Sequence, residues 1–326
     1  MRAVIYEGFG GVEVLKIVSL PDPEPGPEQL LVRVRAAALN RADTLQRKGE
    51  YSPPPGESTV LGIEIAGEVV AAGSGVRGIV PGERVFGLIG SGGYAELCLL
   101  DQGMAIPVPE GWSWAEAAAV PEGFFVADTT LIQLGKLKKE NTVLVHAAGS
   151  GMGSACVQLA HHVGAEVLCT AGSAEKIERA KLLGAVAGVN HKTHDFAEEV
   201  LRLTGGEGVD LVVDFVGATY LSRNLAVLKP GGRLVQAGLL TGWEATLNLM
   251  TLVLRRLQIL GTAMRPLPIA EKRLIAARFR EQWLPELVAG RLVPIVDSVF
   301  PFTEVARAHE TMEENRNFGK IVLTFD

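Results

Sequence analysis

The feature that most constrains the fold is a glycine-rich run in the middle of the chain. An apolar strand, Val143–Ala147, leads into Ala148-Gly149-Ser150-Gly151-Met152-Gly153, and a helical pattern follows. A tight turn here lets the backbone approach a pyrophosphate, and the helix N-terminus supplies N–H donors and a positive dipole end. We therefore expect a dinucleotide to bind at Ala148, Ser150, Gly151, Met152 and Gly153. The alternative is a helix-start turn that binds no ligand.

The pattern around this run alternates between strands and helices. Strands are predicted at 143–147, 166–170, 186–190, 211–216, 233–237 and 258–262, and helices at 153–163, 174–183, 196–204 and 220–228. Strands separated by helices require crossover connections, which give a parallel sheet. Six strands match the doubly wound order with two mononucleotide-binding halves. We predict an α/β Rossmann dinucleotide-binding domain over residues 123–265.

The segment before residue 122 is β-rich. Short strands are predicted at 3–6, 12–19, 29–38, 63–72, 84–88 and 94–100, with a helix over 114–134. Gly and Pro turns separate the strands, and Tyr51-Ser52-Pro53-Pro54-Pro55-Gly56 forms a stiff loop. The tail adds a helix over 271–289 and a strand over 320–325, which we expect to return to this part. We predict one β-rich domain from 1–122 and 266–326.

Composition excludes several classes of protein. Lys and Arg number 31 against 37 Asp and Glu, so a net charge of −6 gives no positive field for nucleic acid or an anionic membrane. The three cysteines, Cys98, Cys156 and Cys169, are odd in number and widely spaced, which fits buried thiols in a reducing compartment. With no signal-peptide pattern and no membrane-length apolar run, we expect a cytoplasmic protein.

The residues after the second Rossmann strand indicate which dinucleotide binds. An NAD site usually has Asp or Glu there. This chain has Gly172 and the hydroxyl of Ser173, followed by the cations Lys176 and Arg179. We predict NADPH over NADH, because a charged hydrogen bond to the 2′-phosphate is worth about 1.5–3 kcal/mol. Alternatively, Lys176 and Arg179 form a solvated helix face, and Glu175 would weaken the preference.

Three further runs carry a family resemblance: Ala38-Leu39-Asn40-Arg41-Ala42-Asp43, Gln46-Arg47-Lys48-Gly49-Glu50-Tyr51 and Leu61-Gly62-Ile63-Glu64-Ile65-Ala66-Gly67-Glu68-Val69. They resemble the zinc-free quinone oxidoreductases of the medium-chain dehydrogenase/reductase superfamily, and the proline loop and Ser150 resemble most closely the tumour-suppressor-inducible subfamily. The resemblance runs nearly end to end. It implies a GroES-like catalytic domain, a Rossmann domain, NADPH-dependent reduction of quinones and a homodimer joined through its Rossmann sheets.

Residue types argue against a metal site. Zinc is held by sulfur or imidazole ligands in the zinc alcohol dehydrogenases of this superfamily. Residues 1–97 contain no Cys and no His, and Ile63 stands where those enzymes usually have a ligating His. The four-cysteine structural lobe is also absent. We therefore expect no metal and no alcohol oxidation of the zinc type.

The resemblance places Asn40, Asp43 and Tyr51 in the cleft near the nicotinamide. Asn40 is expected to hold the carboxamide or a substrate oxygen. Tyr51 is expected to donate to a quinone oxygen or to form an aromatic wall. The alternative for Asn40 and Asp43 is a helix start, with Asn40 as N-cap and Asp43 at N3. The alternative for Tyr51 is packing under the proline loop.

Other cofactor contacts are expected at the ends of strands. The loops after the fourth and fifth Rossmann strands hold Gly217, Gly238, Leu239 and Leu240, and ligands bind at such carboxyl ends. The resemblance adds Asn317 in a C-terminal loop over the cofactor. It also gives His191 where the family often has Tyr; protonation would then raise NADPH affinity as the pH falls, unless His191 is an ordinary surface residue.

Two more positions are of interest. Val126 stands where the family often has a cofactor-facing Thr, and it cannot form the same hydrogen bond. Arg265 follows the sixth strand, and it either faces the cleft or forms a surface salt bridge.

The sequence favours an NADPH-dependent reductase of small-molecule quinones. The alternative enzyme reduces an activated C=C bond in an enone or alkenal, for which Tyr51 is the obvious proton donor. A third possibility is a non-catalytic NADPH-binding sensor. A hydrolase is disfavoured because Ser150 does not lie in a G-x-S-x-G motif.

Overall fold

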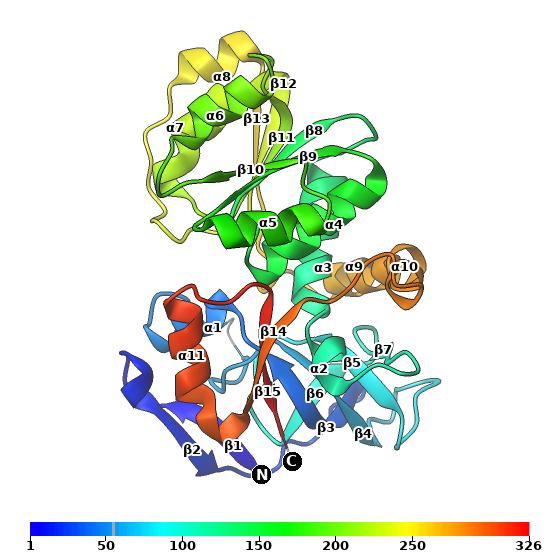
Figure 1. Ribbon diagram of the computed structural model, residues 1–326. Helices are drawn as coiled ribbons and strands as arrows, with labels where there is room; N and C mark the ends of the chain where they lie inside the picture. The colour runs from blue at the N-terminus through cyan, green and yellow to red at the C-terminus, as the bar shows by residue number, and fades with distance from the viewer. Residues whose placement is uncertain (54–55, 326) are drawn as a thin grey trace. The chain divides into compact units, whose positions relative to one another are not determined.

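A computed structural model describes residues 1–53 and 56–325, so Pro54 and Pro55 of the predicted proline loop lie outside the described residues, as does Asp326. The chain divides into two compact units (Figure 1). The first consists of Met1–Glu122 together with Met264–Asp326, and the second of Gly123–Ala263.

The second unit is built on a six-stranded parallel sheet in the order β10-β9-β8-β11-β12-β13. Its strands are β8 (Thr142–Val145), β9 (Glu166–Ala171), β10 (Ala187–Asn190), β11 (Val209–Asp214), β12 (Leu228–Gln236) and β13 (Gln258–Gly261). Its helices are α4 (Gly151–Val163), α5 (Ala174–Leu182), α6 (Phe196–Leu203), α7 (Leu221–Val227) and α8 (Leu249–Arg255). The strand order reverses between β8 and β11, so the predicted doubly wound sheet is confirmed.

Both faces of this sheet are covered. Leu144, Leu168, Val212 and Leu234, from four neighbouring strands, share one buried cluster with Phe196 and Val200 of α6 and Leu225 of α7. Neighbouring residues in a strand point to opposite faces, and α4 packs against β8 and β9. Burial on both faces explains why these strands are continuous apolar runs in the sequence.

The first unit contains a seven-stranded sheet in the order β14-β15-β3-β4-β5-β7, with β6 also paired to β3, and a separate pair, β1-β2. The strands are β1 (Arg2–Tyr6), β2 (Leu15–Ser19), β3 (Gln29–Ala38), β4 (Glu64–Ala72), β5 (Arg84–Leu88), β6 (Leu97–Asp101), β7 (Ile106–Pro107), β14 (Val296–Pro301) and β15 (Lys320–Thr324). β15 lies antiparallel to β3, with Val322 opposite Ala38, so the predicted return of the last strand is confirmed.

Two helices predicted as continuous are interrupted. The segment 114–134 forms α2 (Trp114–Ala118), α3 (Pro121–Ala127) and a π-helix over Asp128–Leu134. Proline has no N–H to donate, so Pro121 starts a new helix instead of continuing the old one. The segment 271–289 forms α9 (Ile269–Gln282) and α10 (Leu284–Val288), with Pro285 in the first turn of α10.

Other elements differ at their ends or were not predicted. Val12–Val14 is a 3₁₀ turn that precedes β2, and the strand predicted at 94–100 begins at Leu97. β14, α8 and α11 (Val305–Glu313) were not predicted as elements, whereas α1 (Arg41–Arg47) is the helix start that was given as the alternative for Asn40 and Asp43. α8 has only seven residues, and most of its apolar side chains are exposed, so the sequence does not show a helix with one buried face.

The three cysteines are free and buried, as predicted. Burial raises the pKa of each thiol to about 12, so none is a reactive thiolate at neutral pH. Within residues 1–53 and 56–325, no helix combines the length and the apolar character needed to cross a bilayer. The cytoplasmic location stays a prediction.

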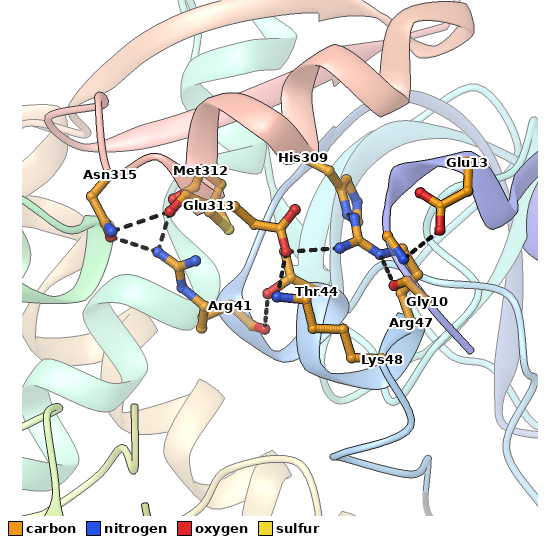
Figure 2. A network of polar contacts seen from close by, with 11 residues as sticks. Gly10, Glu13, Arg41, Thr44, Arg47, Lys48, His309, Met312, Glu313 and Asn315 are labelled. Carbon is orange, nitrogen blue, oxygen red and sulfur yellow. Dashed lines mark hydrogen bonds and ion pairs between the residues drawn. The ribbon is translucent and has the colours of Figure 1, made fainter. Parts of the chain in front are cut away.

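A buried arginine joins α1 to α11 and to the turn near Gly10 (Figure 2). Arg47 is fully buried; its Nε donates to the Gly10 carbonyl (3.1 Å) and its Nη2 to Glu313 (2.7 Å). Nη1 lies 3.1 Å from His309 Nδ1. Burial lowers the pKa of His309 to about 3, so the ring is neutral and Nδ1 accepts from the guanidinium. Lys48 contacts the same Glu313 carboxylate from a more exposed position.

Arg47→Met should lower the free energy of unfolding by about 3 kcal/mol, because it leaves the buried partners of the guanidinium without a donor. Lys48→Met is the matched control, and it should cost less than about 1 kcal/mol because Lys48 is exposed and its side chain can return to water. Denaturant unfolding followed by tryptophan fluorescence measures both. Equal losses in the two variants would contradict the role given to Arg47.

Candidate functional site

The glycine-rich loop has the geometry that close approach of a phosphate requires. Ala147 has a left-handed φ of +52°, and Ser150 caps α4 by accepting from the Gly153 amide at 2.9 Å. A Cβ on Gly153 would lie 2.2 Å from the Ala147 carbonyl oxygen, so only glycine fits. The next amides of the helix, at Gly151 and Met152, have no partner within the helix itself. The start of the 13-residue helix α4 thus has a geometry that suits a pyrophosphate, and the binding itself stays a prediction.

The loop after β9 has a cationic side chain close to its backbone. Ser173 is the N-cap of α5, and its Oγ accepts from the Lys176 amide at 3.3 Å. A Cβ on Gly172 would lie 3.2 Å from Lys192 Cε and 3.4 Å from His191 Nε2. Lys192 was not named from the sequence, although it follows His191 directly. The ammonium group of Lys192 lies near the end of β9, where an acidic residue would stand in an NAD site.

The surroundings of His191 oppose its protonation. Partial burial and the neighbouring Lys192 lower the pKa of the imidazole below its ordinary value. The ring is therefore neutral near pH 7, and the fixed positive charge beside Gly172 belongs to Lys192. Any gain in phosphate affinity from His191 protonation is moved to a lower pH than the sequence suggested.

The loops after β11 and β12 are joined by backbone hydrogen bonds. Thr241 N donates to the Val216 carbonyl (2.8 Å), and Ala218 N donates to the Gly242 carbonyl (3.2 Å). Gly217 has φ +97°, and a Cβ there would lie 2.9 Å from Gly242 O. Gly238 is packed as tightly, since its Cβ would meet Phe215 O at 2.6 Å. The predicted residues Leu239 and Leu240 are about half exposed, at 49% and 47%.

Asn317 belongs to the first unit, unlike the other predicted cofactor residues. Its side-chain amide donates to the Gly319 carbonyl at 2.7 Å, within the turn that leads into β15. Gly319 has φ +102°, and a Cβ there would lie 2.4 Å from the Ile295 carbonyl oxygen. The observed role of Asn317 is to shape this turn, and its contact with a cofactor stays a prediction.

The first unit holds a buried polar triangle of Asn40, Glu64 and Lys320. Asn40 Nδ2 donates to Glu64 Oε1 (2.8 Å), and Lys320 Nζ donates to Asn40 Oδ1 (2.7 Å). Lys320 also forms an ion pair with Glu64. The Asn40 amide thus has protein partners at both ends. Asn40 is the N-cap of α1, as the helix-start reading predicts, and its contact with a carboxamide or a substrate oxygen stays a prediction.

Asp43 follows the helix-start reading. Its carboxylate accepts from Asn40 N (2.8 Å), Gly62 N (3.1 Å) and the Tyr94 hydroxyl (3.0 Å). It is fully buried, and burial raises its pKa to about 6. A carboxylate with these three protein donors positions α1 and the Gly62 loop, so contact with a substrate is not required to explain it.

Arg265 is not a surface residue, so the salt-bridge alternative is wrong. Only 5% of its surface is exposed; Nε donates to Gly90 O (2.7 Å) and Nη2 to Gln46 Oε1 (2.8 Å). Nη1 is buried and has no hydrogen-bond partner among the described residues. The guanidinium carbon lies 5.5 Å from the ring centroid of Tyr51, which is half-buried. A buried donor without a partner marks a place where a ligand oxygen would be stabilised.

Glu122 is a second residue with a buried polar atom that has no hydrogen-bond partner among the described residues, and it was not predicted as a site residue. Its backbone N–H donates to Glu64 Oε2 (2.8 Å), while its own Oε2 is buried without a partner among the described residues. Burial, then repulsion from Glu64, raises the pKa of Glu122 to about 7. The charge of Glu122 also helps to raise the pKa of the Tyr51 hydroxyl, although burial is the main cause. The sequence does not show the raised pKa of Glu122, because Glu64, which contributes to it, is 58 residues away and only the fold brings the two together.

Metal ligands are not grouped in the part of the chain that the structure describes. No three His, Cys, Asp or Glu side chains among these residues lie together so as to hold an ion. Ile63 is buried at 2% exposure, at the position named above for a zinc ligand in related enzymes.

Comparisons with known families match both units. Residues 26–110 match the family described as the alcohol dehydrogenase GroES-like domain, and residues 151–278 match the family described as zinc-binding dehydrogenase. The human synaptic vesicle membrane protein VAT-1 homolog is 34% identical over 99% of this chain and 86% of its own length. Quinone oxidoreductase of Rattus norvegicus is 31% identical over 99% of this chain and 97% of its own.

Solved structures agree in fold over the whole chain. Escherichia coli quinone oxidoreductase complexed with NADPH has a TM-score of 0.91 at 28% identity, and the match covers 100% of both chains. An NAD-dependent alcohol dehydrogenase has a TM-score of 0.88 at 37% identity, again over 100% of both chains. The CurK enoyl reductase has a TM-score of 0.86 at 28% identity over 100% of this chain and 99% of its own.

Proposed function

Because the chain belongs to the medium-chain dehydrogenase/reductase superfamily and is related to quinone oxidoreductases, we propose that it uses NADPH to reduce quinones. Oxidoreductase activity with a nicotinamide cofactor follows from this membership. The observation that carries the finer proposal is the buried, unpartnered Nη1 of Arg265 beside the Tyr51 ring.

This pair suits a flat acceptor with a carbonyl oxygen. A nicotinamide bound to the second unit would supply a hydride, and a quinone oxygen would gain negative charge as the quinone is reduced. A fixed donor from Arg265, held by Gly90 and Gln46, stabilises that oxygen without reorganisation. Burial raises the pKa of Tyr51 above its ordinary value, so its hydroxyl stays protonated and its ring offers an apolar wall. A quinone needs little more, because its reduced product is a stabilised hydroquinone.

The proposed preference for NADPH rests on the cation close to the loop after β9. Lys192 and the capped Ser173 bracket Gly172, and no acidic side chain takes the place that binds a free ribose in NAD enzymes. The adenosine 2′-phosphate would bind there, with the ammonium group of Lys192 as its partner.

Glu122 favours a second candidate, the reduction of an activated C=C bond. Such a reaction must add a proton to carbon, which requires an acid that is protonated near neutral pH. With a pKa of about 7, Glu122 is partly protonated near neutral pH, and its Oε2 has no hydrogen-bond partner among the described residues. The structural match to an enoyl reductase is in line with this alternative.

We also propose a homodimer joined through the second unit. β13 is an edge strand, and Ile259 on it is 38% exposed. The adjacent α8 exposes Leu249, Met250, Val253 and Leu254, each by more than 60%. An exposed edge with an apolar helix beside it is typical of a surface covered by a second copy.

Arg265→Met should lower kcat/KM for a quinone by roughly 10- to 150-fold, because it removes one charged hydrogen bond to the developing oxyanion. The Kd of NADPH should stay within about twofold. Gln46→Leu removes one of the two groups that hold the guanidinium but keeps the Nη1 donor, so it should lower kcat/KM less than Arg265→Met does. A quinone kcat/KM in Arg265→Met equal to that of wild type would contradict the assignment.

Lys192→Ala should reduce the preference for NADPH over NADH by roughly 10- to 150-fold, through loss of the contact to the 2′-phosphate. Lys181→Ala removes a cation of α5 that pairs with Glu178, and should leave the preference unchanged. Titration of both nucleotides against each variant measures this. An unchanged ratio in Lys192→Ala would locate the 2′-phosphate elsewhere.

Val253→Asp with Ile259→Lys should convert a dimer into a monomer, because two charges would have to be buried in the interface. Sedimentation velocity compares the variant with wild type, and the melting temperature controls for folding. A wild-type mass of one chain would contradict the dimer.

A further inference from the structure

Four buried polar side chains form a continuous chain across the carboxyl end of the parallel sheet. Thr170 Oγ1 lies 2.9 Å from His146 Nδ1, and His146 Nε2 lies 2.7 Å from Asn224 Oδ1. Asn224 Nδ2 donates to Asp214 Oδ2 at 2.9 Å. All four are at most 1% exposed. We call Thr170, His146, Asn224 and Asp214 the polar chain.

The direction of each hydrogen bond is fixed. An ionised Asp214 can only accept, so Asn224 presents its NH₂ group to it and its oxygen to His146. His146 must then carry its proton on Nε2, which leaves Nδ1 to accept from the Thr170 hydroxyl. Burial lowers the pKa of His146 to about 3, so the ring stays neutral over the physiological range. Phe196 and Tyr220 pack edge-on against it, with centroids 4.7 and 4.8 Å away.

Three members of the polar chain lie at the start of a loop of the proposed cofactor site. His146 directly precedes the left-handed Ala147 of the glycine-rich loop. Thr170 lies near the end of β9, just before Gly172, and its carbonyl accepts from Ala148 N at 3.0 Å. Asp214 ends β11 and accepts from Val216 N (2.6 Å) and Gly217 N (3.3 Å). Asn224 comes from α7 and links His146 to Asp214.

We infer that the polar chain is a positioning device that sets the three loops after β8, β9 and β11 relative to one another for NADPH binding. The inference rests on the proposed function, because it assumes that these loops bind the dinucleotide. Apolar side chains in the same places could fill the core, but they would not fix the loops in register. A chain with every donor matched to an acceptor admits one arrangement, whereas a broken chain leaves a buried group unsatisfied.

An exchange of two members provides the sharpest test. Asn224→Asp alone places two carboxylates in contact. Asp214→Asn alone puts a second NH₂ group opposite that of Asn224, because the carboxylate oxygens at 214 also accept from the Val216 and Gly217 amides. The double variant Asn224→Asp/Asp214→Asn restores a matched order, because Asn at 214 donates to Asp at 224, which accepts from His146. It also keeps the net charge.

The measurement is the Kd of NADPH at pH 8, where Asp214, with a pKa raised to about 6 by burial, is ionised. Each single variant should weaken binding by roughly fivefold to a hundredfold. The exchange variant should return the Kd to within about twofold of wild type. The quinone KM should change little in all three, since the acceptor side chains lie in the first unit.

The outcomes separate the two proposals. Wild type that binds neither NADPH nor NADH would overturn the proposed function and this inference with it. Wild type that binds NADPH, with single variants that melt earlier but bind equally well, would overturn the inference alone. Failure of the exchange variant to regain affinity would also overturn it. If the single variants do not fold, Thr170→Val removes only the hydroxyl donor, and it should weaken binding while folding is retained; unchanged affinity there counts against the inference.

Discussion

The buried carboxylate of Glu64 is the interaction on which the first unit depends most. A fully buried charge is tolerated only when it is paired and hydrogen-bonded. Here one oxygen accepts from Asn40 and Lys320, and the other accepts from the Glu122 amide. These partners come from the start of α1, from the last strand and from α3. One side chain therefore ties together segments from the beginning, middle and end of the chain.

That arrangement decides which polar groups are available for chemistry. The side chains of Asn40, Asp43 and Lys320 have protein partners, so they hold the framework. In the first unit, the described residues with a buried polar atom that has no partner include Arg265 (Nη1) and Glu122 (Oε2), besides Ser298 (Oγ) and His309 (Nε2). Only the first two are charged groups near Tyr51. One is a permanent hydrogen-bond donor, and the other is an acid with a pKa near 7. The first suits a quinone oxygen, and the second suits a carbon that must be protonated.

The sequence predicted the parallel sheet well, because short apolar strands and the glycine-rich turn are local signals. It also contained both readings of Asn40, as a helix cap and as a polar site residue. It could not predict the partners of Arg265, since Gln46 is 219 residues away and only the fold brings them together. The same holds for Lys320 and Asn40, which are separated by 280 residues. Pro121 was a local signal for a helix break that the prediction of one helix over 114–134 did not use.

The most direct test is the acceptor specificity of the purified chain, followed by oxidation of NADPH and NADH. The panel contains an ortho-quinone, a para-quinone, an alkenal and an alcohol couple. We expect fast NADPH-dependent turnover of the quinones and little turnover of the others. Turnover of the alkenal alone would move the assignment to C=C reduction by way of Glu122. Tight NADPH binding with no turnover of any acceptor would contradict the enzyme and favour a sensor.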